Sequence, residues 1–183
     1  MKIETTHIHG VYLLSPEPFI DARGSFSRIF CREELATISP GITIEQINHS
    51  VTVRKGCVRG LHFQHAPHAE KKIVKCIRGR VFDVAVDLRK NSRTLMQWYG
   101  TVLSAENMQA LVIPEGCAHG FQALDDNVEL IYMSTAAYCS EAEGTLHHKD
   151  PAIGIAWPED VTLVSPKDNA QIFLPTNFVG IEV

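Results

Sequence analysis

The sequence contains no uninterrupted apolar run of the roughly 18 residues that a membrane-spanning helix needs. Its first ten residues also lack the apolar core of a secretory signal peptide. No low-complexity stretch, internal repeat or linker interrupts the chain. These absences exclude a transmembrane helix and predict a cytoplasmic protein with a single domain that spans residues 1–183.

Cysteine pairs and excess positive charge are absent as well. The five cysteines are scattered and form no C-x-x-C motif, which predicts free thiols in a reducing compartment. Lysine and arginine number 17 against 21 acidic residues, for a net charge of −4. This balance argues against nucleic acid as a partner, although a few local basic groups can still hold a small anion.

Glycine, proline, aspartate and asparagine recur at short intervals and separate apolar runs of about five to nine residues. Such spacing is typical of an all-β sandwich or barrel. Only residues 32–38 favour a helix, which Pro40-Gly41 would end. The runs that predict strands are 57–64, 71–78, 81–88, 96–103, 108–113 and 128–135.

Residues 81–88 show the clearest period of two. Phe82, Val84, Val86 and Leu88 fall on one face, and the other face carries two carboxylates, Asp83 and Asp87, among small apolar residues. Two interpretations fit this pattern: a surface strand with a solvated polar face, or a strand that lines a polar cavity inside a small barrel.

Nine histidines are present, three of them within residues 62–68. Gly56-x5-His62 followed by His65, His68 and Glu70 loosely resembles the first metal motif of cupin barrels, and Pro114-x-Gly116-x2-His119 matches the second. The first motif requires His-x-His, however, and Gln64 stands at the second ligand position. Because an amide is a poor ligand for a divalent transition metal, we predict no metal site and place His65 and His68 in a solvated loop.

His62 differs from its neighbours because it lies within a predicted strand. A histidine in a barrel interior is either a core residue with its hydrogen bonds satisfied or a proton-transfer group. The sequence around it leaves both interpretations open.

Eight motifs, in order and at matching spacing along nearly the whole chain, resemble the dTDP-4-dehydrorhamnose 3,5-epimerase family. They are Asp21-x-Arg23-Gly24-x-Phe26, Gln46-x-Asn48-His49-Ser50, Arg59-Gly60-Leu61-His62, Gly79-x-Val81-x-Asp83-Val84-x-Val86-Asp87-Leu88-Arg89, Leu103-Ser-Ala-Glu-Asn107, Ile113-Pro-x-Gly116-x-Ala118-His119-Gly120-Phe121, Asp150-Pro151-x-Ile153-x-Ile155-x-Trp157-Pro158 and Ser165-x-Lys167-Asp168. The resemblance implies a cupin-type jelly roll with one or two short helices, and a homodimer whose subunits exchange N-terminal strands. It also implies a cofactor-free inversion of C3 and C5 of a dTDP-4-keto-6-deoxyhexose, which supplies L-rhamnose or a related deoxysugar for surface polysaccharide.

The resemblance assigns four catalytic residues. His62 corresponds to the base, Asp168 to the carboxylate that orients it, Tyr132 to the acid on the opposite face of the sugar, and Lys72 to the cation near the ketone oxygen. Each also has a structural alternative, such as a rim aromatic for Tyr132, a surface lysine for Lys72 or a turn residue for Asp168.

The same resemblance assigns the binding residues. Arginine forks suit a diphosphate, and aromatic rings suit stacking on a nucleobase. Arg23 and Phe26 are expected to reach the site from the partner subunit. The full set of binding candidates is Arg23, Arg59, His119, Phe19, Phe26, Gln46, Asn48, Asp83, Tyr138 and Glu143.

Three positions depart from the family pattern. Arg28 replaces a glutamate that often contacts thymine, His147-His148 stands where a tryptophan is usual, and Cys117 replaces an aromatic residue. These changes leave the base, its carboxylate and the acid untouched, but they bear on which sugar nucleotide is bound.

Several other functions stay open at this stage. A single-site 3- or 5-epimerase or a ketoisomerase would share the barrel and much of the site. A metal-dependent cupin enzyme and a non-catalytic sugar-binding module are alternatives from other classes. The presence of a base and an acid argues against the binding module, since binding alone needs neither. The residues concerned are His62, Asp168, Tyr132 and Lys72.

Overall fold

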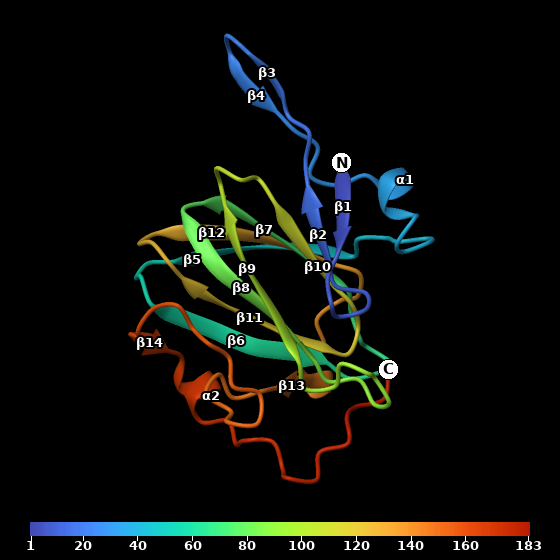
Figure 1. Cartoon of the computed structure of the whole chain (residues 1–183), viewed down its shortest axis with the longest axis vertical. Coiled ribbons are helices and arrows are strands. Elements are labelled where there is room, and N and C mark those ends of the chain that lie inside the picture. The colour runs from blue at the N-terminus through green and yellow to red at the C-terminus, as the bar shows by residue number, and fades with distance from the viewer.

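Two sheets facing each other form the body of the computed structural model, which describes all residues 1–183 (Figure 1). In spatial order, the first sheet comprises β1 (Lys2–Thr5), β2 (Tyr12–Ser15), β10 (Ala110–Ile113), β7 (Lys72–Arg78), β12 (Val128–Ser134) and β5 (Gln46–Thr52). The second comprises β13 (Glu143–Thr145), β6 (Cys57–Gln64), β11 (Cys117–Ala123), β8 (Arg80–Asp87) and β9 (Trp98–Ser104), with β14 (Leu163–Val164) parallel to β6. The predicted all-β sandwich is confirmed.

The remaining elements are short. A hairpin of β3 (Phe19–Asp21) and β4 (Gly24–Phe26) projects beyond the sandwich as an arm (Figure 1). The helical segments are α1 (Arg32–Leu35), the 3-10 turn η1 (Ser140–Ala142) and α2 (Pro166–Asn169). No helix in the structure combines the length and the apolar character that crossing a bilayer requires.

The main core lies between the two sheets. Val74 and Leu111 from the first sheet belong to one buried cluster with Val81 and Phe121 from the second. This packing settles the two interpretations of residues 81–88. Asp83 points inward and is fully buried, so β8 lines the interior of the sandwich with its polar face.

Each sheet is also covered on its outer face. The apolar face of β8, with Val84 and Val86, packs in a second cluster beneath Ile153 and the C-terminal residues Leu174 and Phe178. The outer face of the first sheet is covered by a third cluster that includes Leu35 of α1. Both sheets are therefore buried on two sides, which is why several strands lack a polar face.

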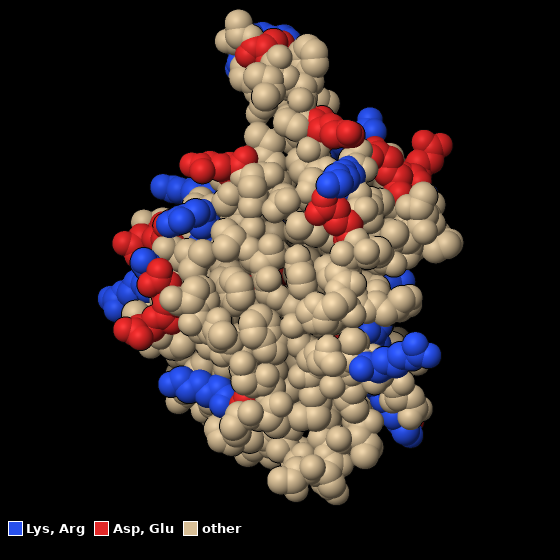
Figure 2. All heavy atoms as spheres, in the orientation of Figure 1, with Lys and Arg blue, Asp and Glu red and all other residues tan.

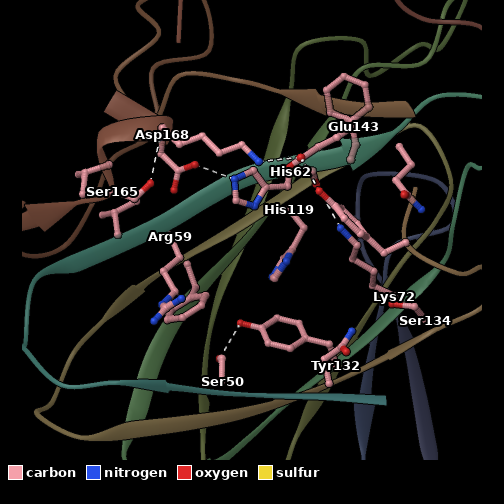
Figure 3. A pocket seen from close by; sticks show the side chains of 18 of the residues that line it. Ser50, Arg59, His62, Lys72, His119, Tyr132, Ser134, Glu143, Ser165 and Asp168 are labelled. Carbon is pink, nitrogen blue, oxygen red and sulfur yellow. Dashed lines mark hydrogen bonds and ion pairs between the residues drawn. The ribbon is translucent and has the colours of Figure 1, made fainter. Parts of the chain in front are cut away.

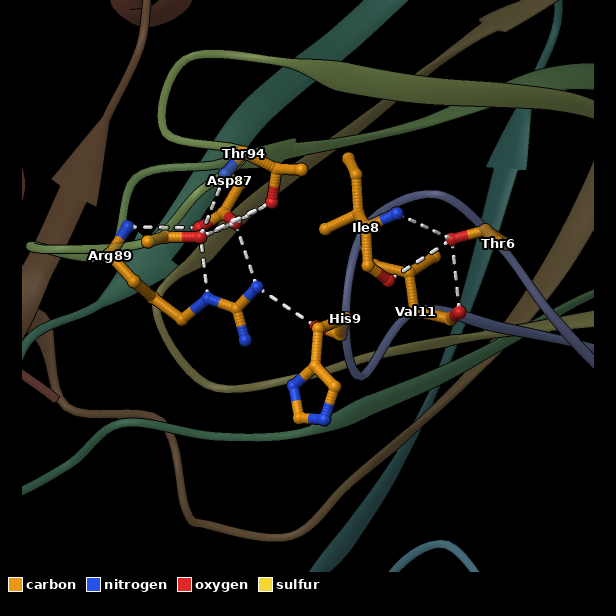
Figure 4. Close-up of polar contacts among 8 residues, drawn as sticks. Thr6, Ile8, His9, Val11, Asp87, Arg89 and Thr94 are labelled. Carbon is orange, nitrogen blue, oxygen red and sulfur yellow. Dashed lines mark hydrogen bonds and ion pairs between the residues drawn. The ribbon is translucent and has the colours of Figure 1, made fainter.

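A buried carboxylate fixes the end of β8 (Figure 4). Asp87 accepts hydrogen bonds from the Arg89 guanidinium (2.8 Å), the Ser92 hydroxyl (2.6 Å) and the Thr94 hydroxyl (2.7 Å). Burial alone would raise the pKa of Asp87, but these donors outweigh it and lower the pKa to about 2. Arg89 also donates to the carbonyl of His9 at 2.9 Å, which ties the β1–β2 turn to the second sheet.

The six predicted strands are all present, with small shifts at their ends. The helix predicted over 32–38 is shorter than expected. Its regular part ends at Leu35, and the chain continues as turns to Pro40-Gly41. The prediction omitted β11, whose seven residues are all buried, so it shows neither alternation nor a polar face. It also omitted β5, whose residues are mostly exposed or half-buried and mostly polar, and the short strands β1–β4, β13 and β14.

Charged side chains of both signs lie on the face of the molecule that Figure 2 shows. On the face in Figure 2, aspartate and glutamate lie beside lysine and arginine on the upper part and the left, the lower right edge carries lysine and arginine, and the centre is uncharged. This distribution agrees with the small net charge of the sequence.

Candidate active site

A cavity of about 630 Å³ opens between the two sheets and is bounded by α2 and the segment around Tyr138 (Figure 3). Its volume is in the range of pockets that hold small-molecule ligands. The walls contain most of the predicted residues, namely His62, Asp168, Tyr132, Lys72, Arg59, His119, Gln46, Asn48, Tyr138 and Glu143.

His62 and Asp168 form a dyad at the wall of the cavity. His62 Nε2 lies 2.7 Å from Asp168 Oδ1, and the backbone N–H of Gly60 donates to Asp168 Oδ2 at 3.2 Å. The imidazole is 36% exposed and the carboxylate only 6%. The carboxylate is therefore held by the protein on both oxygens, while the imidazole keeps one face open to the cavity.

The environment of Asp168 keeps it ionised. Burial alone would raise its pKa, but the hydrogen bond and charge of His62, the Gly60 N–H and Ser165 together lower it below its usual value. Ser165 caps α2 by accepting the N–H of Asp168 at 3.0 Å, and Pro166 occupies the first helical position. Pairing of β14 with β6 then places α2 beside His62.

Glycines let β6 and β11 approach closely next to the dyad. Gly60 has a φ of +104°, and a Cβ there would lie 2.6 Å from the carbonyl oxygen of His119. A Cβ on Gly120 would lie 2.7 Å from the carbonyl oxygen of Arg59. Only glycine fits at these two positions. The close approach of β6 and β11 brings His62 and His119 into register on adjacent strands.

Tyr132 enters the cavity from the opposite sheet. It lies on β12, and its hydroxyl is 3.2 Å from the Ser50 hydroxyl on β5. Its ring packs edge-on against His119, with ring centroids 5.8 Å apart. Burial raises the pKa of Tyr132 above its usual value, so the phenol is neutral and can donate a proton.

A second histidine–aspartate pair lies behind the first. His119 Nε2 is 2.9 Å from Asp83 Oδ2, and both side chains are almost completely buried. Asp83 is not among the residues that line the cavity and reaches it only through His119, so its place among the binding residues stays a prediction. The register of β8 and β11 puts the carboxylate behind the His119 ring.

Two cations reach the cavity. The Lys72 ammonium donates to the carbonyl of His62 at 3.3 Å and pairs with Glu70 at 3.1 Å. Arg59 donates from Nε to Thr52 Oγ1 at 2.9 Å and from Nη2 to the carbonyl of Val51 at 3.0 Å. Both cations are therefore held in place by neighbouring groups of the protein.

Polar groups around Tyr138 form the cavity mouth. The Tyr138 hydroxyl donates to Glu143 Oε2 at 2.9 Å, and Lys167 Nζ donates to the same oxygen at 2.6 Å. Gln46 Oε1 accepts the backbone N–H of Tyr138 at 3.0 Å. Burial alone would raise the pKa of Glu143, but Lys167 and Tyr138 lower it overall.

Arg23, Phe19 and Phe26 lie outside this cavity, on the projecting arm. Arg23 pairs with Asp21 of the same hairpin, and the side chains of Phe19 and Phe26 are 65% and 75% exposed. The arm of a chain does not reach the cavity of that chain. Their expected place in a partner's site stays a prediction.

The histidines near residue 65 show why the metal motif is incomplete. The Gln64 amide donates to the carbonyls of His68 and Ala137 and accepts the N–H of Cys139, so it braces a loop. His65 is exposed and packs against Phe63, and Glu70 pairs with Lys72. The described residues contain no group of three or more His, Cys, Asp or Glu side chains arranged to hold a metal ion.

Sequence reasoning missed several residues that face the cavity, including Ser50, Glu70, Ser165 and Lys167. Ser50 had a usable signal, because it alternates with Gln46 and Asn48 on one face of a strand. Lys167 had only its place beside Asp168, and nothing in the sequence indicated its contact with Glu143.

Comparison with known proteins decides the family. A family model described as dTDP-4-dehydrorhamnose 3,5-epimerase matches residues 5–175. A protein of that name from Salmonella typhimurium is 45% identical over 178 residues, which cover 95% of this chain and 96% of the relative. The chain belongs to the dTDP-4-dehydrorhamnose 3,5-epimerase family. The prediction of a sugar-nucleotide epimerase is thereby confirmed.

Solved structures agree with the family. A dTDP-6-deoxy-D-glucose-3,5-epimerase from Legionella pneumophila, in complex with dTDP-4-keto-L-rhamnose, superposes with a TM-score of 0.91 at 35% identity. That alignment covers 100% of this chain and 98% of the other. The predicted jelly-roll fold of this family is confirmed. A curated dTDP-4-dehydrorhamnose 3-epimerase from Streptomyces niveus is also similar, at 39% identity over 95% of this chain and 84% of the relative.

Proposed function

We propose that this enzyme inverts C3 and C5 of a dTDP-linked 4-keto-6-deoxyhexose by proton abstraction and return through an enolate, without a cofactor, in the synthesis of a deoxysugar. The observation that supports this most strongly is the arrangement of His62 and Tyr132. They extend into one cavity from facing sheets, His62 from β6 and Tyr132 from β12 (Figure 3). Removal of a proton from one face of a carbon and delivery to the other is what inversion requires.

His62 is the base in this proposal. When Asp168 accepts the Nε2–H, Nδ1 remains free to take a proton. The carboxylate then stabilises the imidazolium that forms. Both C3 and C5 are adjacent to the C4 ketone, so the same base can act on both carbons if the sugar is reoriented between the two steps.

Tyr132 is the acid and Lys72 stabilises the enolate. The raised pKa of Tyr132 keeps its proton in place until the carbanion develops. The Lys72 ammonium lies near the dyad and is suited to the negative charge that develops on the C4 oxygen. Arg59, fixed by Thr52 and Val51, is placed to bind the diphosphate.

The nucleoside belongs at the cavity mouth. Gln46, Asn48 and Tyr138 supply hydrogen-bonding groups and a ring on which a base can stack. We further propose a homodimer in which the arm of one subunit carries Arg23, Phe19 and Phe26 to the cavity of the other. The exposure of these aromatic rings on a projecting hairpin supports this, because isolated apolar side chains of that size gain from burial.

Proton NMR of dTDP-4-keto-6-deoxyglucose with the protein in D₂O tests the reaction. We expect deuterium at both C3 and C5, with L-rhamno product trapped by a reductase. Exchange at C3 alone would identify a single-site enzyme. This outcome is worth testing because the chain is also similar to the 3-epimerase of Streptomyces niveus. Absence of exchange at either carbon would refute the proposal.

Mixed dimers test the arm. A His62→Ala subunit lacks the proposed base, and an Arg23→Ala subunit lacks the arginine of the arm. If each arm serves the other subunit's cavity, the mixed dimer has one intact site and regains activity that neither homodimer shows. If the arm serves its own cavity or none, mixing restores nothing.

A further inference from the structure

An ion pair at the cavity mouth lies next to the dyad and takes no part in the proton transfers described above. Lys167 Nζ is 2.6 Å from Glu143 Oε2. The Glu143 side chain is only 14% exposed, whereas Lys167 is 57% exposed. Lys167 directly precedes Asp168 on α2, and Glu143 begins β13.

The register of β13 on β6 places the Glu143 carboxylate close to the base. Thr145 pairs with His62 and Glu143 pairs with Gln64, so Glu143 and His62 are diagonal neighbours on one face. Diagonal neighbours are separated by about 7–8 Å between their Cα atoms. Figure 3 shows Glu143 and His62 side by side above the cavity.

We propose that Lys167 is a positioning residue that neutralises Glu143 and so removes a negative charge that would otherwise act on the imidazole of His62. An uncompensated carboxylate beside the ring would stabilise the imidazolium and leave less of the neutral base. Asp168 cannot be the group that is neutralised, because its negative charge is needed to orient the ring. The ion pair with Lys167 therefore neutralises Glu143 and leaves the negative charge of Asp168 to act on His62.

The other charged or titratable groups around His62 are compensated or lie on other walls. Lys72 pairs with Glu70, and His119 pairs with Asp83. The groups that face the His62 region from all elements are Asp168 and Lys167 on α2, Glu143 on β13, Lys72 on β7 with Glu70 before it, Cys57 and Arg59 on β6, His119 on β11, Tyr132 on β12 and Tyr138 before η1. Among the carboxylates in this set, Glu143 is paired with an ammonium, that of Lys167, which is mostly exposed. Mutation of Lys167 therefore removes the neutralising charge with the least disturbance of the core.

This inference depends on the proposed role of His62 and is tested on its pH profile. Lys167→Met is expected to move the acid limb of the C3 and C5 exchange rate upward by about 0.5–1.5 pH units, as an unneutralised carboxylate near the ring in a partly solvated site would. Its rate on the alkaline plateau should stay close to that of the parent protein. Glu143→Gln should move the limb slightly the other way, and the double variant should return it toward the original position.

Lys167→Arg keeps the charge and should retain the original profile. Lys55→Met is the matched control, because it breaks the 2.9 Å Lys55–Glu159 pair away from the cavity. A loss of rate that is equal at all pH values in Lys167→Met would overturn the proposal and leave a structural role for the pair. An unchanged profile would overturn it as well.

NMR titration of the His62 ring without substrate separates this proposal from the proposed reaction. The His62 signal is assigned by its loss in His62→Ala. An upward shift of its titration midpoint in Lys167→Met supports the role of the pair whether or not the substrate is correct. Absence of exchange in the parent protein refutes the reaction alone.

Discussion

The two histidine–aspartate pairs consist of the same residue types at nearly the same distance, 2.7 Å for His62–Asp168 and 2.9 Å for His119–Asp83. Their environments differ. The His62 imidazole is 36% exposed, whereas the His119 imidazole is 6% exposed and Asp83 is fully buried. Two rings with similar partners therefore have different access to a ligand.

The difference arises from how each pair is assembled. His119 and Asp83 lie on adjacent strands, β11 and β8, in the middle of a sheet. Asp168 comes from α2, outside the sheet, and is separated from His62 by 106 residues. Because the partner of His62 approaches from the edge of the cavity, one side of that ring stays open. Access to the cavity, rather than residue type, therefore distinguishes a candidate base from an internal support.

The largest effect should follow from breaking the open pair. Asp168→Asn should slow exchange at C3 and C5 by about 10²–10⁴-fold, since it removes the carboxylate that fixes the tautomer and stabilises the imidazolium. His62→Ala should lose at least as much. The measurement is the deuterium exchange rate by NMR, with circular dichroism to show that the fold is kept. Near-normal exchange in either variant would show that His62 is not the base.

Tyr132 links the two pairs, because it packs on His119 and faces the same cavity as His62. Tyr132→Phe removes the proposed acid and keeps the ring. We expect proton abstraction and deuterium incorporation to persist while formation of the inverted product falls by about 10²-fold or more. The ratio of exchange to product in one NMR series measures this. If inversion continues at the parent rate, another group must deliver the proton.

The buried pair should matter for stability more than for proton abstraction. Asp83→Asn should lower the free energy of unfolding by about 1–3 kcal/mol, because it leaves polar atoms of a buried pair without a suitable partner. Urea denaturation measures this, with Asp168→Asn as the comparison, where we expect a smaller loss. A larger loss in Asp168→Asn would reverse the distinction between the two pairs.

His148 provides a third environment, a buried ring without any carboxylate partner. Neither ring nitrogen has a hydrogen-bond partner, and the ring stacks on His147 at 4.6 Å. Burial, together with the charges of His147 and Lys149, lowers the pKa of His148 from 6.5 to about 4. The unfolded chain therefore binds more protons than the folded protein between these values.

Stability should consequently fall as the pH drops from about 6.5 to about 4, which is the direction for a histidine held neutral. His148→Phe should flatten this part of the profile, as measured by the urea midpoint at several pH values. Asp168 contributes to stability for a different reason: the fold favours its charged form and lowers the pKa of the carboxyl. Its contribution is lost only at more acidic pH. The same slope in His148→Phe and the parent would contradict this assignment.

Much of the fold and the catalytic set could be predicted from the sequence. The alternation in residues 81–88 predicted a strand with one apolar face, because side chains two residues apart share a face whatever the rest of the chain does. The glycine and proline spacing predicted short strands for a similar local reason. His62, Asp168, Tyr132 and Lys72 were found through the family resemblance and do lie in one cavity.

Contacts that depend on pairing between distant strands could not be predicted in this way. The inward face of β8 followed from packing of both sheets, and Asp83 was hidden behind His119 by a register that no local pattern encodes. The bracing role of Gln64 and the Glu143–Lys167 pair likewise depend on segments that meet only in the folded chain.

The sequence by itself therefore indicated six of the strands and the chemical groups that are available, since backbone preference and side-chain alternation act over a few neighbouring residues. Only the tertiary structure decided which histidine keeps an open face, which carboxylate is neutralised and where the arm carrying Arg23 projects. Those outcomes depend on sheet order and register, because they bring together groups as far apart as His62 and Asp168.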